Sequence, residues 1–404
     1  MSWAHDAVFY HLYPLGALGA PARNDFSLPP CPRLDALHAW LDHLTDLGSN
    51  ALYLGPLFES TTHGYDTADY FTVDRRLGDH AAFVRFAEAA HRRGIRLVLD
   101  AVFHHVGRDF WAFRDVRERG ADSPYRDWFF LDFTGRSPYG DPFAYQGWHG
   151  HLNLVKLNTD HPAVRAHLFA AVRHWLDSFA IDGLRLDAAD ALDLGFQRDL
   201  AAFCRSLRPD FWLMGEVVHG DYRRWANPDA LDSVTNYELY KALYSSHNDR
   251  NYFELAYALN RQSGPDGLYR DLALYTFADN HDQDRIASRL DDPVHLEPLY
   301  ALLLTAPSVP SIYYGSEWGI EGRKVAGSDA PLRPALDSTD LRRPAPRPAL
   351  RASIRRLIRL RRAHPALRSG AYRQLHVAHE QLAFLRTAEQ EQIVVAVNAA
   401  HVPA

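Results

Sequence analysis

Short apolar segments alternate with longer segments of helical periodicity along most of the chain, without any literal sequence repeat. The short segments are rich in β-branched and aromatic residues, which is typical of buried strands. Strands that alternate with helices indicate βα units and a parallel sheet. Eight strands are predicted, at residues 8–13, 51–57, 96–103, 183–188, 212–217, 233–236, 272–278 and 311–315.

The segments between these strands have the spacing of amphipathic helices. Within residues 34–47 apolar side chains recur every three or four positions, and Gly48 follows as a C-terminal stop. Residues 83–91 repeat this pattern, and residues 162–179 begin with a proline directly after a capping Asp-His pair. Eight strand–helix units predict an α/β fold, the (β/α)8 TIM barrel.

One long excursion interrupts the pattern after the third strand, at residues 106–157. Periodicity disappears there and aromatic residues become frequent. Eight units spread over roughly 350 residues exceed the ~250 of a plain barrel, so an insertion is expected. We predict a small subdomain that overhangs the C-terminal rim of the barrel, where active sites of such barrels lie.

A second region without barrel character follows the eighth strand. Residues 340–348 are rich in proline and arginine and indicate a linker, which a helix at 350–363 follows. Three antiparallel strands are then predicted, at 371–376, 382–386 and 393–398. We expect one small sheet that docks on the helix through Leu375, Leu382, Phe384, Val394 and Ala396 and leaves the third strand exposed. The natural domain could extend further than this chain.

The predicted domain organisation follows from these two regions. It comprises a catalytic barrel at 1–105 and 158–364, an inserted subdomain at 106–157 and a short C-terminal β domain at 365–404.

Composition excludes several classes of protein. The 404 residues carry a net charge of −6, and acids and bases alternate, so no nucleic-acid partner is predicted. Two cysteines, Cys31 and Cys204, are too few for a disulfide scaffold. The N-terminus lacks the features of a signal peptide, and no apolar run approaches the ~20 residues that cross a bilayer. A cytoplasmic protein without membrane contact is expected.

Four predicted strands end in polar residues, at the place where barrel catalysis is assembled. The segments are Asp100-Ala-Val-Phe-His104-His105, Gly183-Leu-Arg185-Leu-Asp187, Gly215-Glu216 and Phe277-Ala-Asp279-Asn280-His281-Asp282. Each alone is a weak signal, because charged residues at strand ends are often only solvated. Together, in this order on the strands of one barrel, they predict an active site.

These segments resemble the signature regions of the α-amylase family, glycoside hydrolase family 13. The residues from His63 to Thr67, His-Gly-Tyr-Asp-Thr, and those from Pro310 to Glu317 extend the resemblance over nearly the whole chain. Residues 154–158, Leu-Val-Lys-Leu-Asn, are similar to the short signature of the neopullulanase, cyclomaltodextrinase and maltogenic amylase branch. The resemblance implies a glycosidase that acts on α-glucan oligosaccharides and needs no cofactor.

Retaining hydrolysis of a glycosidic bond needs two carboxyl groups ~5–5.5 Å apart. Asp187 is the expected nucleophile, and Arg185 on the same strand can keep it ionised. Glu216 fits the general acid/base, whose pKa must be raised by its site. The resemblance places the third carboxylate, Asp282, against the sugar hydroxyls and the transition state.

The remaining substrate-binding residues come from the resemblance. His105 and His281 are candidate donors to hydroxyl groups of the sugar at the cleavage site. Tyr65 matches a position that stacks under that sugar, and Asp66 one that binds the terminal glucose. Arg333 resembles the arginine that partners this aspartate. The aromatic residues of the insertion form either a small core of their own or stacking surfaces for sugar rings.

The chain also departs from the family pattern. His104 stands where the family has an asparagine that ligates calcium in secreted members, and imidazole argues against a calcium site. No suitably spaced ligands join the two histidines, so no metal is predicted. Ala189, Asp190 and Ala191 replace the usual Lys-His after the nucleophile, so contacts to the leaving group must differ. The N-terminal β domain through which the branch dimerises is not expected here, and the oligomeric state stays open.

Three functions remain possible at this point. The first is hydrolysis of α-1,4 or α-1,6 bonds in short, branched or cyclic maltooligosaccharides through a covalent β-glycosyl-aspartate. The second is a transglycosidase or isomerase that uses the same intermediate, on α-glucans or on small α-glucosides such as sucrose or trehalose. The third is a catalytically dead binding subunit, although such relatives lose carboxylates or gain a membrane anchor.

Overall fold

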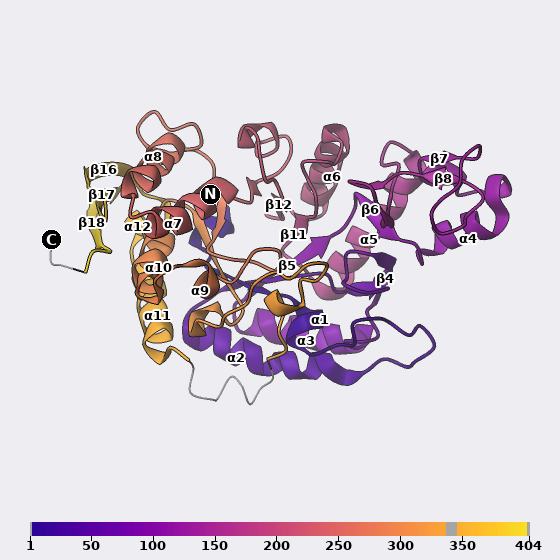
Figure 1. The fold of residues 1–404 in the computed structure, drawn as a ribbon, viewed down its shortest axis with the longest axis horizontal. Helices are drawn as coiled ribbons and strands as arrows, with labels where there is room; N and C mark the ends of the chain where they lie inside the picture. The colour runs from indigo at the N-terminus through magenta and orange to yellow at the C-terminus, as the bar shows by residue number, and fades with distance from the viewer. Residues whose placement is uncertain (1, 337–345, 402–404) are drawn as a thin grey trace.

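The structure of the chain, a computed structural model, describes residues 2–336 and 346–401. Its centre is an eight-stranded sheet in the order β13-β12-β11-β5-β2-β1-β15-β14, and all neighbouring strands are parallel. A parallel bridge between Thr235 and Tyr275 joins the two end strands. The sheet is therefore the predicted TIM barrel, nearly closed on itself (Figure 1).

Each of the eight predicted strands overlaps one strand of this sheet. They are β1 (Phe9–Leu12), β2 (Ala51–Leu54), β5 (Arg96–Ala101), β11 (Gly183–Leu186), β12 (Trp212–Gly215), β13 (Ser233–Val234), β14 (Tyr275–Phe277) and β15 (Val309–Tyr313). Most hydrogen-bonded ladders end two residues or more before the predicted C-terminal ends. Because the apolar pattern continues past the last ladder bond, sequence overestimates the strands at the end where the active site lies.

Helices surround the barrel. They are α1 (Pro14–Ala17), α2 (Leu37–Leu47), α3 (His80–Arg92), α5 (Pro162–Phe179), α6 (Leu194–Leu207), α7 (Tyr237–Asn248), α8 (Tyr252–Ser263), α9 (Ile286–Arg289), α10 (Leu296–Thr305), α11 (Pro348–Ala363) and α12 (Pro365–Ser369). Gly48 ends α2 in the left-handed conformation, with φ of 98°, and its N–H donates to the Leu44 carbonyl. The predicted stop at Gly48 is therefore confirmed, since glycine takes this conformation at little cost.

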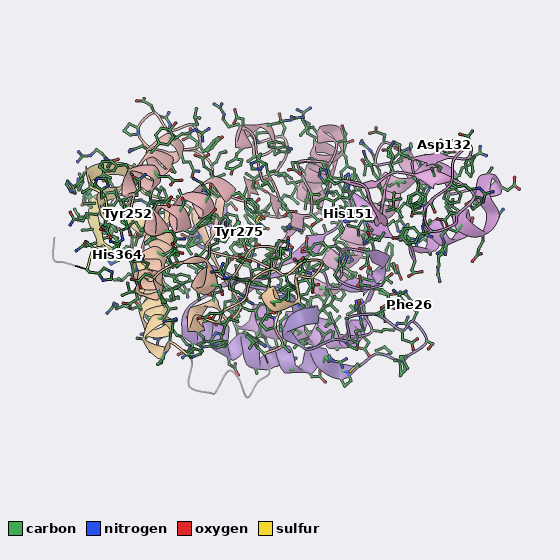
Figure 2. The ribbon with its side chains drawn as sticks, viewed as in Figure 1. Phe26, Asp132, His151, Tyr252, Tyr275 and His364 are labelled. Atoms are coloured by element: carbon green, nitrogen blue, oxygen red, sulfur yellow. The ribbon has the colours of Figure 1, made fainter. Side chains whose placement is uncertain are left out.

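Aromatic side chains fill the barrel interior. The ring of Phe9 lies 5.1 Å from that of Trp212 and 5.4 Å from that of Tyr275, which Figure 2 labels. All three side chains are buried. The barrel is thus a packed core rather than an open channel.

The insertion leaves and rejoins the barrel beside the end of β5. Strand β6 (His105–Gly107) pairs antiparallel with β10 (His151–Lys156), and the Leu157 N–H donates to the His104 carbonyl at 3.0 Å. Between them lie α4 (Trp111–Arg119), β7 (Leu131–Asp132), β8 (Ala144–Tyr145) and β9 (Gly147–Trp148). The segment thus starts and ends at the C-terminal rim, as predicted, at the opposite end of the molecule from the C-terminal sheet (Figure 1).

The aromatic residues of the insertion divide between the two proposed roles. Six are buried and continuous with the main hydrophobic core of the barrel, namely Phe110, Phe113, Trp128, Phe129, Phe143 and Tyr145. Phe130 and Trp148 stay partly exposed, and the Trp148 ring lies 6.0 Å from that of His105. Half of the aromatic residues are therefore core residues, although of the main core rather than of a separate one, and Trp148 and Phe130 remain available to a ligand.

The C-terminal sheet has the three predicted strands, β16 (Ala371–Val377), β17 (Gln381–Ala388) and β18 (Glu391–Asn398). Three residues of its expected inner face are exposed, namely Leu375 by 44%, Val394 by 61% and also Ala396. A register shift between Gln374 and His376 displaces Leu375, and along β18 the buried position is Val397 instead. The sheet packs mainly on α8, α10 and α12, so the prediction that it docks on residues 350–363 was wrong.

The two remaining strands, β3 (Phe58–Ser60) and β4 (Thr67–Val73), form a hairpin after β2. Within residues 2–336 and 346–401, no helix is both long enough and apolar enough to cross a membrane.

Candidate active site

Asp187 and Glu216 each follow directly after the last residue of a barrel strand. They succeed Leu186 of β11 and Gly215 of β12, two strands that are paired in register. A Cβ atom at Gly215 would lie 2.5 Å from the Leu231 side chain, so only glycine fits before the glutamate. The two carboxylates are largely buried, with 11% of the Asp187 side chain and 16% of the Glu216 side chain exposed.

One buried guanidinium joins these carboxylates. Arg185 Nη1 donates to Asp187 Oδ1 at 2.7 Å, and Nη2 lies 2.8 Å from Glu216 Oε2. The same Nη1 lies 3.0 Å from Asp100 Oδ1. The sequence predicts that Arg185 serves Asp187. The structure instead divides one cation among three carboxyl groups.

Asp100 is a site residue that the sequence analysis did not single out. Besides Arg185, it accepts hydrogen bonds from the hydroxyl groups of Tyr53 at 2.7 Å and Tyr65 at 3.0 Å. An aspartate in the middle of the apolar run of β5 was the available signal, because a buried charge needs partners. Tyr65, expected beneath a sugar, is thus fixed through its hydroxyl group.

The residue after the nucleophile has an unusual backbone conformation. Ala188 has φ of 45°, a region that alanine seldom adopts. Its N–H donates to Glu216 Oε2 at 3.1 Å. Such local strain persists where the surroundings enforce it, commonly at functional sites. This turn points a backbone donor at the predicted acid/base.

Burial raises the pKa of both Asp187 and Glu216. Arg185 opposes the shift in each case, whereas the charge of Glu216 adds to it at Asp187 and that of Asp282 adds to it at Glu216. Interacting carboxyl groups titrate as a pair. The pair therefore retains a proton to higher pH than ordinary carboxyl groups do, which is the condition that an acid/base requires.

Asp282 lies in the opposite electrostatic environment. Its Oδ2 lies 3.0 Å from His281 Nε2, and its Oδ1 accepts a hydrogen bond from Arg333 Nη2 at 2.9 Å. Burial favours the neutral acid, but His281 and Arg333 outweigh it and hold the pKa of Asp282 well below its usual range. Asp282 therefore stays ionised at pH values where the Asp187–Glu216 pair still holds a proton.

Arg333 reaches this cluster by a contact that the sequence did not predict. Its ion pairs are with Asp282 and, at 3.1 Å, with Asp329. Asp66, the expected partner, instead accepts hydrogen bonds from the backbone N–H and hydroxyl group of Thr62. Within the described part of the chain no ion pair joins Arg333 to Asp66.

The two predicted histidines flank the carboxylates. His105 is buried, and its Nε2 lies 3.7 Å from Asp187 Oδ2. His281 is stacked between the rings of Tyr13 and Tyr65, at centroid distances of 5.9 and 5.4 Å, and its Nε2 also contacts the Tyr65 hydroxyl. The structure thus brings eight of the nine predicted residues into one cluster, namely Asp187, Glu216 and Asp282 with Tyr65, His105, Arg185, His281 and Arg333. Asp66 is the exception, because its side chain is bonded to Thr62.

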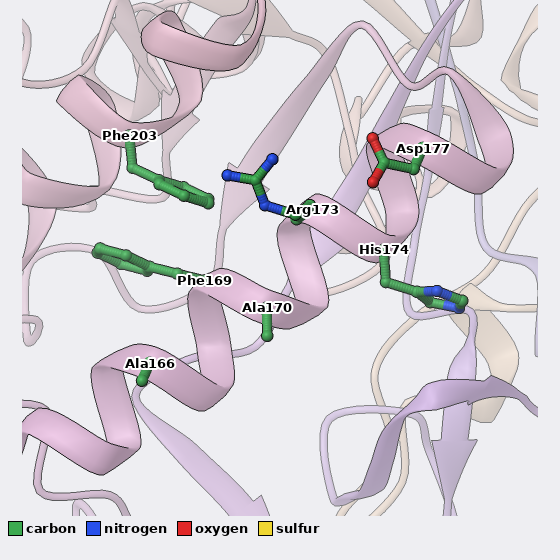
Figure 3. A pocket seen from close by; sticks show the side chains of 7 residues that line it. All are labelled: Ala166, Phe169, Ala170, Arg173, His174, Asp177 and Phe203. Carbon is green, nitrogen blue, oxygen red and sulfur yellow. The ribbon is translucent and has the colours of Figure 1, made fainter.

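A cavity of about 370 Å³ adjoins this cluster. His104, Lys156, Asp190 and Arg224 are among the residues that line it, and the Asp190 N–H donates to the Glu216 carbonyl. Another cavity, of about 460 Å³, lies on the outer surface between α5 and α6, where Phe169 and Phe203 stack (Figure 3). None of the nine predicted site residues lines either cavity, but the first is reached from the site through His104 and the segment after Asp187.

The pair His104–His105 has the features of neutral imidazoles. Burial lowers the pKa of His104 to about 4 and that of His105 to about 3. Within the residues that the structure describes, no group of three histidine, cysteine or carboxylate side chains could hold a metal ion.

Known proteins resemble this chain over nearly its whole length. A family model described as the catalytic domain of α-amylase matches residues 33–347. A cyclomaltodextrinase from a Bacillus species is 33% identical, with 98% of this chain and 73% of that protein aligned. Neopullulanase 2 from Thermoactinomyces vulgaris is 34% identical, over 98% of this chain and 70% of that protein.

Solved structures show the same likeness. The cyclic α-maltosyl-(1→6)-maltose hydrolase from Arthrobacter globiformis, in complex with cyclic α-maltosyl-(1→6)-maltose, superposes with a TM-score of 0.86 at 30% identity. The match covers 98% of this chain and 91% of that one.

Proposed function

The chain belongs to the α-amylase family and is an α-glucan glycosidase, and from that premise we propose that it cleaves its substrate with retention through a covalent intermediate on Asp187. The observation that carries this proposal is the cluster of Asp187, Glu216 and Asp282, two of them on one shared guanidinium. The pKa values of Asp187 and Glu216 are raised, whereas the pKa of Asp282 is lowered.

In the first step Glu216 donates its proton to the glycosidic oxygen while Asp187 attacks the anomeric carbon. The bond from that carbon to the leaving oxygen breaks as the bond to an Asp187 oxygen forms. Arg185 contacts both carboxyl groups, so it stabilises the negative charge that passes from Asp187 to Glu216. In the second step Glu216, now ionised, removes a proton from water, which attacks the same carbon and releases Asp187.

Asp282 acts on the substrate between these groups. Because it stays ionised, it favours the positive charge that develops on the sugar in the transition state. We propose that Tyr65, His105 and His281 surround the sugar at the cleavage site, and that Asp66 and Arg333 bind the part of the substrate beyond it. The segment that follows Asp187 lines the cavity of about 370 Å³, which fits the leaving group.

We propose short, cyclic or branched maltooligosaccharides as the substrates. The named relatives and the Arthrobacter globiformis hydrolase support this class. The cavity beside Glu216 supports it too, because polar and charged side chains line most of it, as recognition of hydroxyl groups requires.

The test is a panel of linear, cyclic and branched α-glucans, with sucrose and trehalose, in which products and their anomeric form are followed. Short maltooligosaccharides released first as the α-anomer support the proposal. Products longer than the substrate, or isomers of sucrose or trehalose, would indicate a transglycosidase or isomerase instead. Binding without turnover on every substrate would identify a catalytically dead binding subunit.

A further inference from the structure

His11 is a buried ionisable side chain to which the proposed mechanism gives no role. It belongs to β1, and only 2% of its surface is exposed. Its ring stacks on Tyr53 at a centroid distance of 4.2 Å and lies 4.8 Å from Tyr313. Both neighbours are buried barrel residues, so His11 lies inside the barrel beneath the active site.

On the side of the active site, the neighbour of His11 is His281. The two rings are 5.1 Å apart and nearly perpendicular, at 87°. Tyr13 and Tyr65 cover the two faces of His281 at interplanar angles of 10° and 11°. His11 therefore lies at the edge of the His281 ring rather than over one of its faces.

The hydrogen bonds of His281 determine which nitrogen carries its proton. Nε2 lies 3.0 Å from a carboxylate oxygen of Asp282. A carboxylate only accepts, so Nε2 must donate. The hydroxyl group of Tyr65 has one proton, which it donates to Asp100, so its oxygen is a further acceptor for Nε2. In this tautomer Nδ1 of His281 is an acceptor.

Among the described residues, neither Nδ1 of His281 nor Nε2 of His11 has a hydrogen-bond partner, although both atoms are buried. A buried polar atom left unpaired destabilises the fold, so two of them in adjacent rings need an explanation. Burial lowers the pKa of His11 well below its usual value, which leaves a neutral ring with one N–H. A donor on His11, the Nε2–H group, can thus complement the acceptor Nδ1 of His281.

We propose that His11 is a positioning residue for His281: its Nε2–H donates to Nδ1 of His281 through one bridging water. This bridge fixes the rotation of the His281 ring and strengthens its Nε2–H as a donor. The ring then holds Asp282 and the Tyr65 hydroxyl in the arrangement that the transition state needs. The proposal rests on the proposed function only for its effect on catalysis.

The experiment combines NMR of ¹⁵N-histidine-labelled protein with kinetics on a cyclic maltooligosaccharide. The His281 signals are assigned by their loss in His281→Gln. In the unmodified chain we expect the His281 proton on Nε2 and a hydrogen bond at Nδ1. His11→Phe keeps the stacked ring but removes the donor, so the Nδ1 signal should move and kcat should fall about tenfold, with KM within about twofold. His11→Gln supplies an amide donor and should restore both.

Tyr275→Phe provides the matched control, because it removes a different buried hydrogen bond, to Ser311, from the barrel interior. It should leave the Nδ1 signal and kcat unchanged. The proposal is overturned if His281 carries its proton on Nδ1 in the unmodified chain, or if His11→Phe leaves Nδ1 unmoved. Equal loss of kcat in His11→Phe and Tyr275→Phe also overturns it. Unmodified protein that shows no turnover refutes the proposed function instead, and the NMR result still decides the role of His11.

Discussion

Buried arginines occur in two regions of this molecule, and their partners differ. At the barrel mouth Arg185 contacts Asp100, Asp187 and Glu216, three carboxyl groups for one cation. Below the barrel, Arg361 of α11 donates to the Leu304 and Ala306 carbonyls, at the end of α10 and just before β15.

Arg386 of β17 completes this lower region, which we call the C-terminal seam (Arg361 and Arg386 with the carbonyls of residues 304–308 and 370). It donates to the Gly370 carbonyl at 2.9 Å and contacts that of Thr305. Within the part of the chain that the structure describes, neither arginine has a carboxylate partner. Burial lowers the pKa of Arg361 to about 9 and that of Arg386 to about 10.

This difference in partners indicates different roles for the buried arginines of the two regions. In the seam backbone carbonyl groups accept hydrogen bonds from both guanidinium groups. The arginines thereby join the C-terminal elements to the end of α10, where cations are favoured. In the mouth negative charge exceeds positive charge, so the cluster can hold a proton and stabilise a cationic sugar. Substitutions in the mouth should therefore change activity, and substitutions in the seam should change stability.

The largest expected effect is in the mouth. Asp187→Asn and Glu216→Gln should each lower kcat by about 10⁴-fold or more, because each removes a group that makes or breaks a bond. The melting temperature should not fall, since both changes relieve crowding of buried negative charge. Steady-state kinetics and thermal unfolding check this, and small losses of kcat in both variants would end the mechanistic assignment.

Lysine substitutions compare the barrel mouth directly with the C-terminal seam. Arg185→Lys keeps the charge but cannot reach three carboxyl groups, so kcat should fall about a hundredfold while the fold persists. Arg361→Lys should leave kcat unchanged and lower the free energy of unfolding by about 1–3 kcal/mol, because carbonyl groups lose donors. Arg359→Lys, exposed on the same helix, is the control and should change neither. A loss of activity in Arg361→Lys equal to that in Arg185→Lys would abolish the comparison.

The pH dependence of kcat/KM should respond to charges in the mouth. Glu216 must be protonated to act, so activity is lost as the pH rises through its pKa. That pKa is raised by burial and partly by the charge of Asp282. In Asp282→Asn the pKa of Glu216 should be lower. The fall of the residual activity at alkaline pH should therefore begin at a lower pH than in the unmodified chain. A limb at unchanged pH would show that Asp282 does not act on Glu216.

The smallest expected effect is that of a chelator. Activity should survive EDTA, because His104 stands where an oxygen ligand for calcium would be required. Assays before and after dialysis against EDTA decide this. Complete loss that calcium reverses would place a metal site elsewhere in the chain.

The barrel and the placement of its carboxylates at the strand ends could be predicted from the sequence, because both follow from patterns of neighbouring residues along the chain. Apolar strands and helical periodicity are readable along the chain, and Asp187 and Glu216 follow directly after strand ends. The role of Asp100 and the sharing of Arg185 arise from neighbouring strands, which no local pattern reveals. The ion pair of Arg333 with Asp282 likewise joins residues far apart in the chain. The face of the C-terminal sheet was misjudged in part. A register shift at Gln374 displaces Leu375, and the pairing of β17 with β18 places Val397 and Val395, rather than Val394 and Ala396, opposite Leu382 and Phe384.

The central claim is that Asp187 forms a covalent bond to the sugar, and one measurement tests it most directly. A glucosyl fluoride that needs no acid to leave is incubated with Glu216→Gln, which cannot activate water efficiently, and peptides are analysed by mass spectrometry. The account predicts a glycosyl adduct on the peptide that contains Asp187. The double variant, which carries both Asp187→Asn and Glu216→Gln, should show no such adduct. An adduct on another carboxylate, or release of the β-anomer without any adduct, would contradict it.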